Sequence, residues 1–246
     1  MAAKAKLALV TGAGSGIGRA VALTLLDAGY RVACGYSANR AGAQTLQDAF
    51  SGALAVKIDI GSRASVKRAI ASAKKHFKSD IAIVVNNAAL VQEKPFERLT
   101  DADWDRMLAV NLRGAFIVAQ EVLPGMLAKK WGRIVNITSI GGQWGGMRQV
   151  HYAAAKAGLI NLTHSLARLY SPSGVTANAI APGLVATGMI AKELKSKAGK
   201  RKAAQIPVGR IAAPEEIAAG VLYLASDGAA YVTGQTLNIN GGLLMS

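Results

Sequence analysis

Residues 7–18 read LALVTGAGSGIG, a short apolar run that leads directly into a glycine-rich loop. The loop fits the pattern G-x-x-x-G-x-G, with Gly12, Gly16 and Gly18, and it does not fit the commoner G-x-G-x-x-G. Glycines let a backbone turn tightly and approach a pyrophosphate, and the N-terminus of the following helix offers unpaired N–H groups and a partial positive charge. Such a run by itself also suits a plain tight turn. Between an apolar strand and the first helix, it predicts a dinucleotide site.

The rest of the chain repeats this alternation of strand and helix. Short apolar runs of strand length alternate with amphipathic stretches of helical period. Strands are predicted over residues 7–11, 31–36, 53–58, 81–86, 133–138, 176–181 and 236–240, and helices over 16–28, 41–50, 62–77, 103–130, 151–170 and 214–225. The pattern predicts an α/β fold with one doubly wound, Rossmann-type parallel sheet of seven strands and helices on both faces. No linker divides residues 1–246, so we expect a single domain, with an insert over the site at about 184–206.

The composition excludes several classes of protein. Hydrophobic residues make up 51% of the 246, which is ample for a core and too much for a disordered chain. The single cysteine, Cys34, allows no internal disulfide and favours a reducing compartment. Neither a signal-peptide core nor an apolar run of the ~20 residues needed to span a membrane is present, so we expect a cytoplasmic protein without membrane contact. The three histidines are unclustered, so no metal site is predicted.

The formal charge of +15, from 29 basic and 14 acidic residues, raises the question of nucleic acid binding. Aromatic residues are only 5% of the chain, and no zinc spacing or basic recognition helix is present, so we do not expect it. Many of the basic residues lie between Lys192 and Lys202. A solvated helix face is one interpretation of this segment, and a landing site for an anionic substrate carrier is the other.

Further along the chain, a tyrosine and a lysine suggest acid–base chemistry. Tyr152 and Lys156 lie four apart on a predicted helix, so they share one face. A phenol has a reference pKa near 10, and an ammonium within ~4–6 Å favours the phenolate. We therefore expect Lys156 to lower the pKa of Tyr152 toward the range useful for general acid–base catalysis. Ser139 ends a predicted strand, at the edge where open α/β sheets bind ligands, and its hydroxyl can hydrogen-bond a carbonyl oxygen.

Together, the glycine loop, Asn86-Asn87-Ala88-Ala89, Ser139, Tyr152-x-x-x-Lys156 and the stretch 182–187 resemble the short-chain dehydrogenase/reductase family, in order and over essentially the whole chain. The resemblance implies an NAD(P)-dependent oxidoreductase that acts on CH–OH or C=O groups. It implies that Tyr152 is the proton donor, that Lys156 also reaches the nicotinamide ribose, and that Asn111 keeps a water that completes a proton relay. Ala89 departs from the glycine that the family more often carries there.

The end of the second predicted strand bears on the choice of cofactor. An NAD enzyme usually carries Asp or Glu there, which binds the ribose 2′-OH. Here Tyr36 takes that position, and Ser37 and Arg40 can bind a 2′-phosphate, so NADP(H) is predicted in preference to NAD(H). Arg40 is alternatively only the solvated start of a helix. The residues expected to bind the cofactor are Gly12, Ser15, Gly16, Ile17, Gly18, Tyr36, Ser37, Arg40, Asp59, Ile60, Asn86, Ala88, Tyr152, Lys156, Pro182, Gly183, Val185 and Thr187.

The branch of the family that the chain most resembles is the 3-oxoacyl-thioester reductases, including those that act on acetoacetyl-CoA. We therefore predict reduction of a 3-oxoacyl thioester of acyl carrier protein or CoA, with Ser139, Gln143, Tyr152 and Leu184 at the substrate. Lys129 and Lys130 lie where such reductases hold basic residues for the carrier, whereas Ser173 and Leu184 depart from the branch pattern. The alternatives are a small alcohol, sugar or cyclic ketone in an apolar pocket of Trp144, Met147 and Leu184, and, more remotely, a non-catalytic nucleotide-binding module.

A homotetramer is also expected. The predicted helices 103–130 and 151–170 carry apolar residues on more than one face, and the family pairs these helices across a two-fold axis. The residues concerned are Phe116, Val118, Val122, Leu159, Leu162 and Leu166, and the apolar tail 243–245 suits a second interface.

Overall fold

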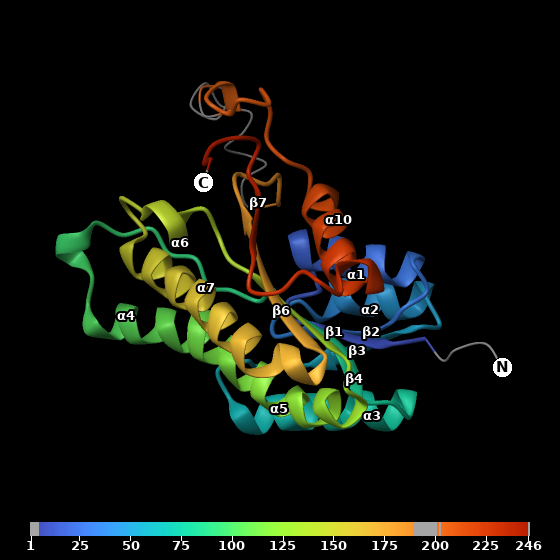
Figure 1. The fold of residues 1–246 in the computed structure, drawn as a ribbon. Helices are drawn as coiled ribbons and strands as arrows, with labels where there is room; N and C mark the ends of the chain where they lie inside the picture. The colour runs from blue at the N-terminus through green and yellow to red at the C-terminus, as the bar shows by residue number, and fades with distance from the viewer. Residues whose placement is uncertain (1–4, 189–200, 202, 246) are drawn as a thin grey trace.

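Seven parallel strands form one sheet in the order β3-β2-β1-β4-β5-β6-β7 (Figure 1). The structure is a computed structural model that describes residues 5–188, 201 and 203–245. The order reverses between β1 and β4, and the crevice at such a switch point is where doubly wound sheets bind ligands. The strands are β1 (Leu7–Val10), β2 (Arg31–Tyr36), β3 (Ala53–Lys57), β4 (Ile81–Asn86), β5 (Gly132–Ile137), β6 (Val175–Pro182) and β7 (Thr236–Ile239).

Helices cover both faces of the sheet, which confirms the predicted fold class (Figure 1). Successive β1 residues show why both faces are needed: Ala8 and Val10 belong to one hydrophobic core, and Leu7 and Leu9 to the other. A strand buried on both sides reads as a continuous apolar run, as residues 7–10 do. One core is closed by α1 (Gly16–Asp27), α2 (Arg40–Ala49) and α10 (Pro214–Ala225), and the other by α3 (Arg63–Phe77), α5 (Gly114–Lys129) and α7 (Val150–Tyr170).

The long helix predicted over 103–130 is not continuous. It begins earlier, as α4 (Asp101–Leu108), passes through a π-helical turn, η2 (Ala109–Arg113), and continues as α5. Thr100 caps α4, in a capping box with Asp103. The turn contains Asn111, a poor helix former, whose side chain bonds both the N–H and the C=O of Leu90, each at 2.8 Å. These bonds to another segment are made at the point where the regular helix is interrupted, and π turns of this kind often mark functional sites.

Four further short helices have defined bounds in the described part of the chain. They are η1 (Phe96–Arg98), α6 (Gly141–Trp144), η3 (Ser171–Ser173) and η4 (Asp227–Ala229), and none of them was predicted. One helical stretch, Asp101–Lys129, is long and apolar enough to cross a membrane by length and composition alone. Half of its most apolar window is buried, and α5 packs on the sheet, so it is a core helix of this fold.

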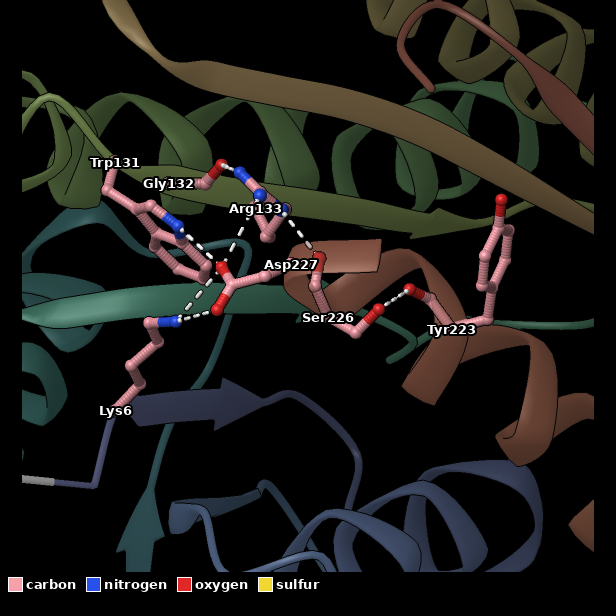
Figure 2. Close-up of polar contacts among 7 residues, drawn as sticks. All are labelled: Lys6, Trp131, Gly132, Arg133, Tyr223, Ser226 and Asp227. Atoms are coloured by element: carbon pink, nitrogen blue, oxygen red, sulfur yellow. Dashed lines mark hydrogen bonds and ion pairs between the residues drawn. The ribbon is translucent and has the colours of Figure 1, made fainter. Parts of the chain in front are cut away.

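Near the amino ends of β1 and β5, Asp227 joins three parts of the chain (Figure 2). Its carboxylate accepts a hydrogen bond from Lys6 Nζ at 2.9 Å and one from Trp131 Nε1 at 3.0 Å, and it lies 3.9 Å from Arg133 Nη2. The Arg133 side chain is almost fully buried, donates to the carbonyl of Ser226, and stacks on Trp131 with its Cζ 4.3 Å from the ring centroid. The cluster therefore fastens the start of β1 and of β5 to the chain just after α10.

We predict that Asp227→Asn lowers the free energy of unfolding by about 1 kcal/mol at neutral pH, since the carboxylate is largely exposed and its ion pairs are partly screened. The pKa of Asp227 lies below its usual value, and the hydrogen bond from Lys6 is the largest cause. A carboxylate with a lowered pKa stabilises the fold above its unfolded pKa near 3.9, and this stabilisation is lost as the pH falls below that value. Urea titrations should thus show a difference from wild type that narrows from about pH 5 to about pH 3. A difference independent of pH would contradict this, and Asp48→Asn, at an exposed position of α2, is the matched control.

Candidate active site

The glycine loop lies at the carboxyl end of β1 and at the start of α1. Gly12 and Gly16 have positive φ angles of 70° and 53°, which L side chains rarely adopt. A Cβ on Gly18 would lie 2.3 Å from the Gly12 carbonyl oxygen, so the first turn of α1 packs against the loop itself. Ser15 is the N-cap of α1, and its side chain makes no cap hydrogen bond. The close-packed glycines leave a cradle, with the N–H groups of the first turn of α1 beside it, that fits a pyrophosphate.

Two residues outside the glycine pattern hold this loop in place. Asn87, just after β4, donates from its amide to the carbonyl of Thr11 at 2.9 Å. The Thr11 hydroxyl accepts from the backbone N–H groups of Asn87 and Ala88, both at 3.0 Å. Sequence reasoning assigned no role to either side chain, although Asn87 belongs to the quoted motif. The bonds fix the distance between the ends of β1 and β4, on the two sides of the switch point.

The segment after β2 is also fastened to the glycine loop. Asn39 donates to the Gly14 carbonyl at 2.9 Å and accepts from the Gly42 N–H at 3.0 Å. A Cβ on Gly42 would lie 2.0 Å from the Gly14 oxygen, so the start of α2 touches the loop directly. Tyr36 ends β2, half-buried, while Ser37 and Arg40 are exposed beside this contact. The predicted 2′-phosphate residues therefore lie next to the loop, held there by Asn39, which the sequence did not single out.

Ser139, Tyr152 and Lys156 come together where β5 ends against α7. The Tyr152 hydroxyl and Ser139 share a hydrogen bond. Lys156 is buried, donates from Nζ to the Ile137 carbonyl at 2.8 Å, and lies 5.5 Å from the centre of the Tyr152 ring. The predicted pair on one helical face is therefore present, with the predicted serine beside it.

The pKa of Tyr152 shifts in the direction opposite to that expected from the sequence. Burial raises the pKa of Tyr152 to about 12, and the hydrogen bond with Ser139 opposes the rise. Burial lowers the pKa of Lys156 to about 8. The physical reason is that the phenol loses its hydration, while the ammonium is directed to the Ile137 carbonyl instead of the phenolic oxygen. The group is consequently set to hold a neutral phenol with a proton to give.

A cleft of about 520 Å³ runs from the glycine loop past this group. Ten of the predicted site residues line it: Ser15, Gly16, Ile17, Ser139, Tyr152, Lys156, Pro182, Gly183, Val185 and Thr187. It is also lined by residues for which no role was predicted, namely Asn87, Ala89, Val91, Ile137, Thr138 and Gly188. One continuous space therefore joins the cradle for a pyrophosphate to the acid–base group.

Other predicted residues lie outside that lining. Gln143 is exposed on α6, and Leu184, Trp144 and Met147 do not line the cleft; Met147 is almost fully exposed. The apolar pocket expected from the last three is therefore not part of this cleft. Gly12 and Gly18 pack against each other within the loop and do not line the cleft. The other predicted residues that are not among its lining are Tyr36, Ser37, Arg40, Asp59, Ile60, Asn86, Ala88 and Asn111. The Asn86 side chain is buried and donates to Asn136 at 2.8 Å.

The described residues hold no group of three or more His, Cys, Asp or Glu that could bind a metal ion. The insert predicted at 184–206 and the basic segment between Lys192 and Lys202 fall mostly outside the described residues, which include only 184–188, 201 and 203–206 of them.

The chain is similar to known proteins over nearly its whole length. A family model described as enoyl-(acyl carrier protein) reductase matches residues 12–244. The chain belongs to the short-chain dehydrogenase/reductase family. It is 40% identical over 237 residues to acetoacetyl-CoA reductase of Rhizobium meliloti (strain 1021), covering 96% of this chain and 98% of that one. It is 38% identical over 242 residues to the 3-oxoacyl-[acyl-carrier-protein] reductase FabG of Escherichia coli (strain K12), covering 98% of both.

A solved structure supports the same assignment. The crystal structure of a protein described as a gluconate dehydrogenase, from Agrobacterium tumefaciens, superposes with a TM-score of 0.92 at 31% identity. The match covers 98% of this chain and 96% of that one. Like its relatives in the family, the chain is an NAD(P)-dependent oxidoreductase.

Proposed function

We propose that the protein reduces a 3-oxoacyl thioester, of acyl carrier protein or CoA, to the 3-hydroxyacyl thioester with NADPH. The observation that carries the proposal is the hydrogen-bonded Ser139–Tyr152 pair with buried Lys156, in one cleft with the glycine cradle. The two named reductases that match nearly the whole chain favour this substrate class. The non-catalytic alternative loses support, since such a module has no need of the intact group.

The chain's own residues suffice for the proton half of the reaction. The bound nicotinamide supplies the hydride to the carbonyl carbon. Ser139 and Tyr152 both line the cleft and would hydrogen-bond the carbonyl oxygen there, and Tyr152 would give that oxygen its proton. As the family resemblance implies, Lys156 would bind the ribose hydroxyls of the cofactor, and a water kept by Asn111 would link Lys156 to solvent. A neutral phenol of high pKa is the form needed for reduction.

The preference for NADPH rests on the end of β2. Tyr36 occupies the place where a carboxylate would repel a 2′-phosphate, and Arg40 and Ser37 are exposed beside the glycine loop. Asp59 and Ile60, with Asn86 and Ala88, lie at the ends of β3 and β4 on the adenine side. The pyrophosphate is assigned to Gly12, Ser15, Gly16, Ile17 and Gly18, and the nicotinamide to Pro182, Gly183, Val185 and Thr187. We propose that Gln143 and Leu184 contact the outer part of the substrate, although neither lines the cleft.

A second candidate is a small alcohol, sugar or cyclic ketone as substrate. The described gluconate dehydrogenase, which superposes on nearly the whole chain, favours it. The deciding experiment is a kinetic screen of acetoacetyl-CoA against gluconate and simple cyclic ketones, each with NADPH and with NADH. The thioester proposal requires the largest kcat/KM for acetoacetyl-CoA with NADPH. A larger value for a small alcohol or ketone would replace it with the second candidate.

We also propose that residues 1–246 form one oxidoreductase domain of a cytoplasmic enzyme, with the substrate-site insert at about 184–206 and no nucleic acid or membrane partner. If the substrate is carried by acyl carrier protein, Lys129 and Lys130 are candidate contacts. Lys129 ends α5, close to the start of β5, at the edge of the sheet away from the catalytic group. A carrier docked at those lysines would lie at the end of the strands opposite to the cleft of the same chain.

We predict a homotetramer, on a narrower set of residues than the sequence suggested. Val118, Val122 and Leu159 are buried within the subunit, so they are not free for an interface. Phe116 is 40% exposed and, with Leu108, Leu112 and Leu162, lines a hollow over α4, η2, α5 and α7. A second copy would cover this apolar surface. Light scattering at micromolar concentration should give four times the chain mass, and Phe116→Arg should lower it; a monomer mass for the wild type would contradict the prediction.

A further inference from the structure

The start of α7, the helix that carries Tyr152, is hydrogen-bonded to a neighbouring segment of the chain. Its N-cap residue, Gln149, makes no side-chain cap hydrogen bond to the helix. Instead, the segment 92–94 that follows β4 bonds the segment 148–151 at three points. The Lys94 N–H donates to the Arg148 carbonyl at 2.8 Å, Gln149 donates to Glu93 at 3.3 Å, and His151 Nε2 lies 2.9 Å from Gln92 Oε1. Of these contacts, the last involves the immediate neighbour of Tyr152.

Segment 92–94 is anchored in turn by Asp103, in the first turn of α4. Asp103 accepts hydrogen bonds from Gln92 Nε2 at 2.9 Å, from Lys94 Nζ, and from the N–H and hydroxyl of Thr100. The hydrogen bond from Lys94, followed by that from Gln92, holds the pKa of Asp103 well below its usual range. Asp103 is therefore an ionised acceptor at neutral pH, and its position is fixed by the capping box.

This anchor determines how Gln92 and His151 are oriented. A carboxylate can only accept hydrogen bonds, so the NH₂ group of Gln92 must face Asp103 and its oxygen must face His151. His151 Nε2 must consequently carry the proton that it shares with Gln92. His151 is fully buried, and its Nδ1 has no hydrogen-bond partner within the described part of the chain. Gln92 is thus the one hydrogen-bonding side chain that orients the His151 ring among those residues.

We propose that Gln92 and His151 are positioning residues for Tyr152. Asp103 orients Gln92, Gln92 orients His151, and His151 fixes the first turn of α7 so that the Tyr152 hydroxyl meets Ser139. The inference rests on the proposed function, in which Tyr152 is the proton donor. A displacement of about 1 Å from the reacting geometry can cost ~10²-fold in rate, so small losses of orientation are measurable. The neighbouring Val91 lines the cleft, so the same segment forms one wall of the site.

The test is a double-mutant cycle with Gln92→Leu and His151→Phe, each of which leaves an apolar side chain of related shape and removes the hydrogen bond. We expect either variant to lower kcat roughly 10- to 100-fold, to leave the Kd for NADPH nearly unchanged, and to raise the solvent deuterium isotope effect on kcat. The double variant should be no slower than the slower single variant, because both changes break one contact. His151→Gln, which restores a donor toward Gln92, should recover part of the loss.

The matched control is Gln44→Leu. Gln44 on α2 donates to Asp48 at 2.9 Å, the same length and chemistry as Gln92 to Asp103, away from the catalytic group. Its kcat should equal that of the wild type. A wild-type kcat for Gln92→Leu, or losses that multiply in the double variant, would overturn the inference. If His151→Phe does not fold, the inference is still tested by comparing kcat and the solvent isotope effect of Gln92→Leu with those of Gln44→Leu. A fully active Tyr152→Phe would instead overturn the proposed function, so the two failures are distinct.

Discussion

Tyr152→Phe is expected to lower kcat by about 10²–10⁴-fold, the usual contribution of a general acid. The change removes the hydroxyl that bonds Ser139 and leaves the ring and the buried Lys156 in place. The Kd for NADPH should therefore stay close to that of the wild type. The measurement is steady-state kinetics with acetoacetyl-CoA, together with a fluorescence titration of NADPH.

Tyr170→Phe is the matched control for this result. Tyr170 ends the same helix and packs on the core around α3 and α5, away from the cleft. It loses the same atom, and its rate should be that of the wild type. A Tyr152→Phe variant that keeps more than about a tenth of the wild-type rate would exclude Tyr152 as the proton donor, because general acid catalysis is worth at least ~10²-fold. The proposed reaction would then need another acid.

Tyr36→Asp is expected to move the cofactor preference from NADPH toward NADH by about 10- to 150-fold. A carboxylate at the end of β2 can accept hydrogen bonds from the ribose hydroxyls of NADH, and it repels the 2′-phosphate of NADPH. One charged hydrogen bond is worth ~1.5–3 kcal/mol, and ~1.4 kcal/mol corresponds to a factor of ten. The two cofactors are compared by kcat/KM at fixed salt concentration.

Tyr231→Asp is the control variant for the effect of the added negative charge. Tyr231 is fully exposed and lines a hollow at the Asp227 edge of the sheet, so the same substitution there changes the net charge alone. A wild type that already prefers NADH would contradict the assignment of Tyr36, Ser37 and Arg40. A Tyr36→Asp variant that keeps the wild-type preference for NADPH would show that the 2′-phosphate is selected elsewhere, and Ser15 in the glycine loop is then the next residue to change.

The loop and the acid–base group could be placed from the sequence because each depends on local spacing. Tyr152 and Lys156 share a face since a helix returns to the same side after about four residues. Gly12, Gly16 and Gly18 follow a buried strand, and the strand order then brings Ser139 to the same edge. The residues that support this group were less visible. Asn39, Thr11 and Asn87 hold the loop through partners at least 25 residues away, so no local pattern marks them.

The sequence by itself determined the seven-stranded α/β fold, the glycine loop and the shared helical face of Tyr152 and Lys156, because hydrophobic period and residue spacing act over a few positions. The tertiary structure alone decided the sign of the pKa shift at Tyr152, since burial and the direction of Lys156 depend on how α7 packs on β5. It also decided the π turn at Asn111, the burial of Arg133 beside Asp227, and the chain of contacts from Asp103 through Gln92 to His151. Each joins segments far apart in the sequence, and only the folded chain brings them within hydrogen-bonding distance.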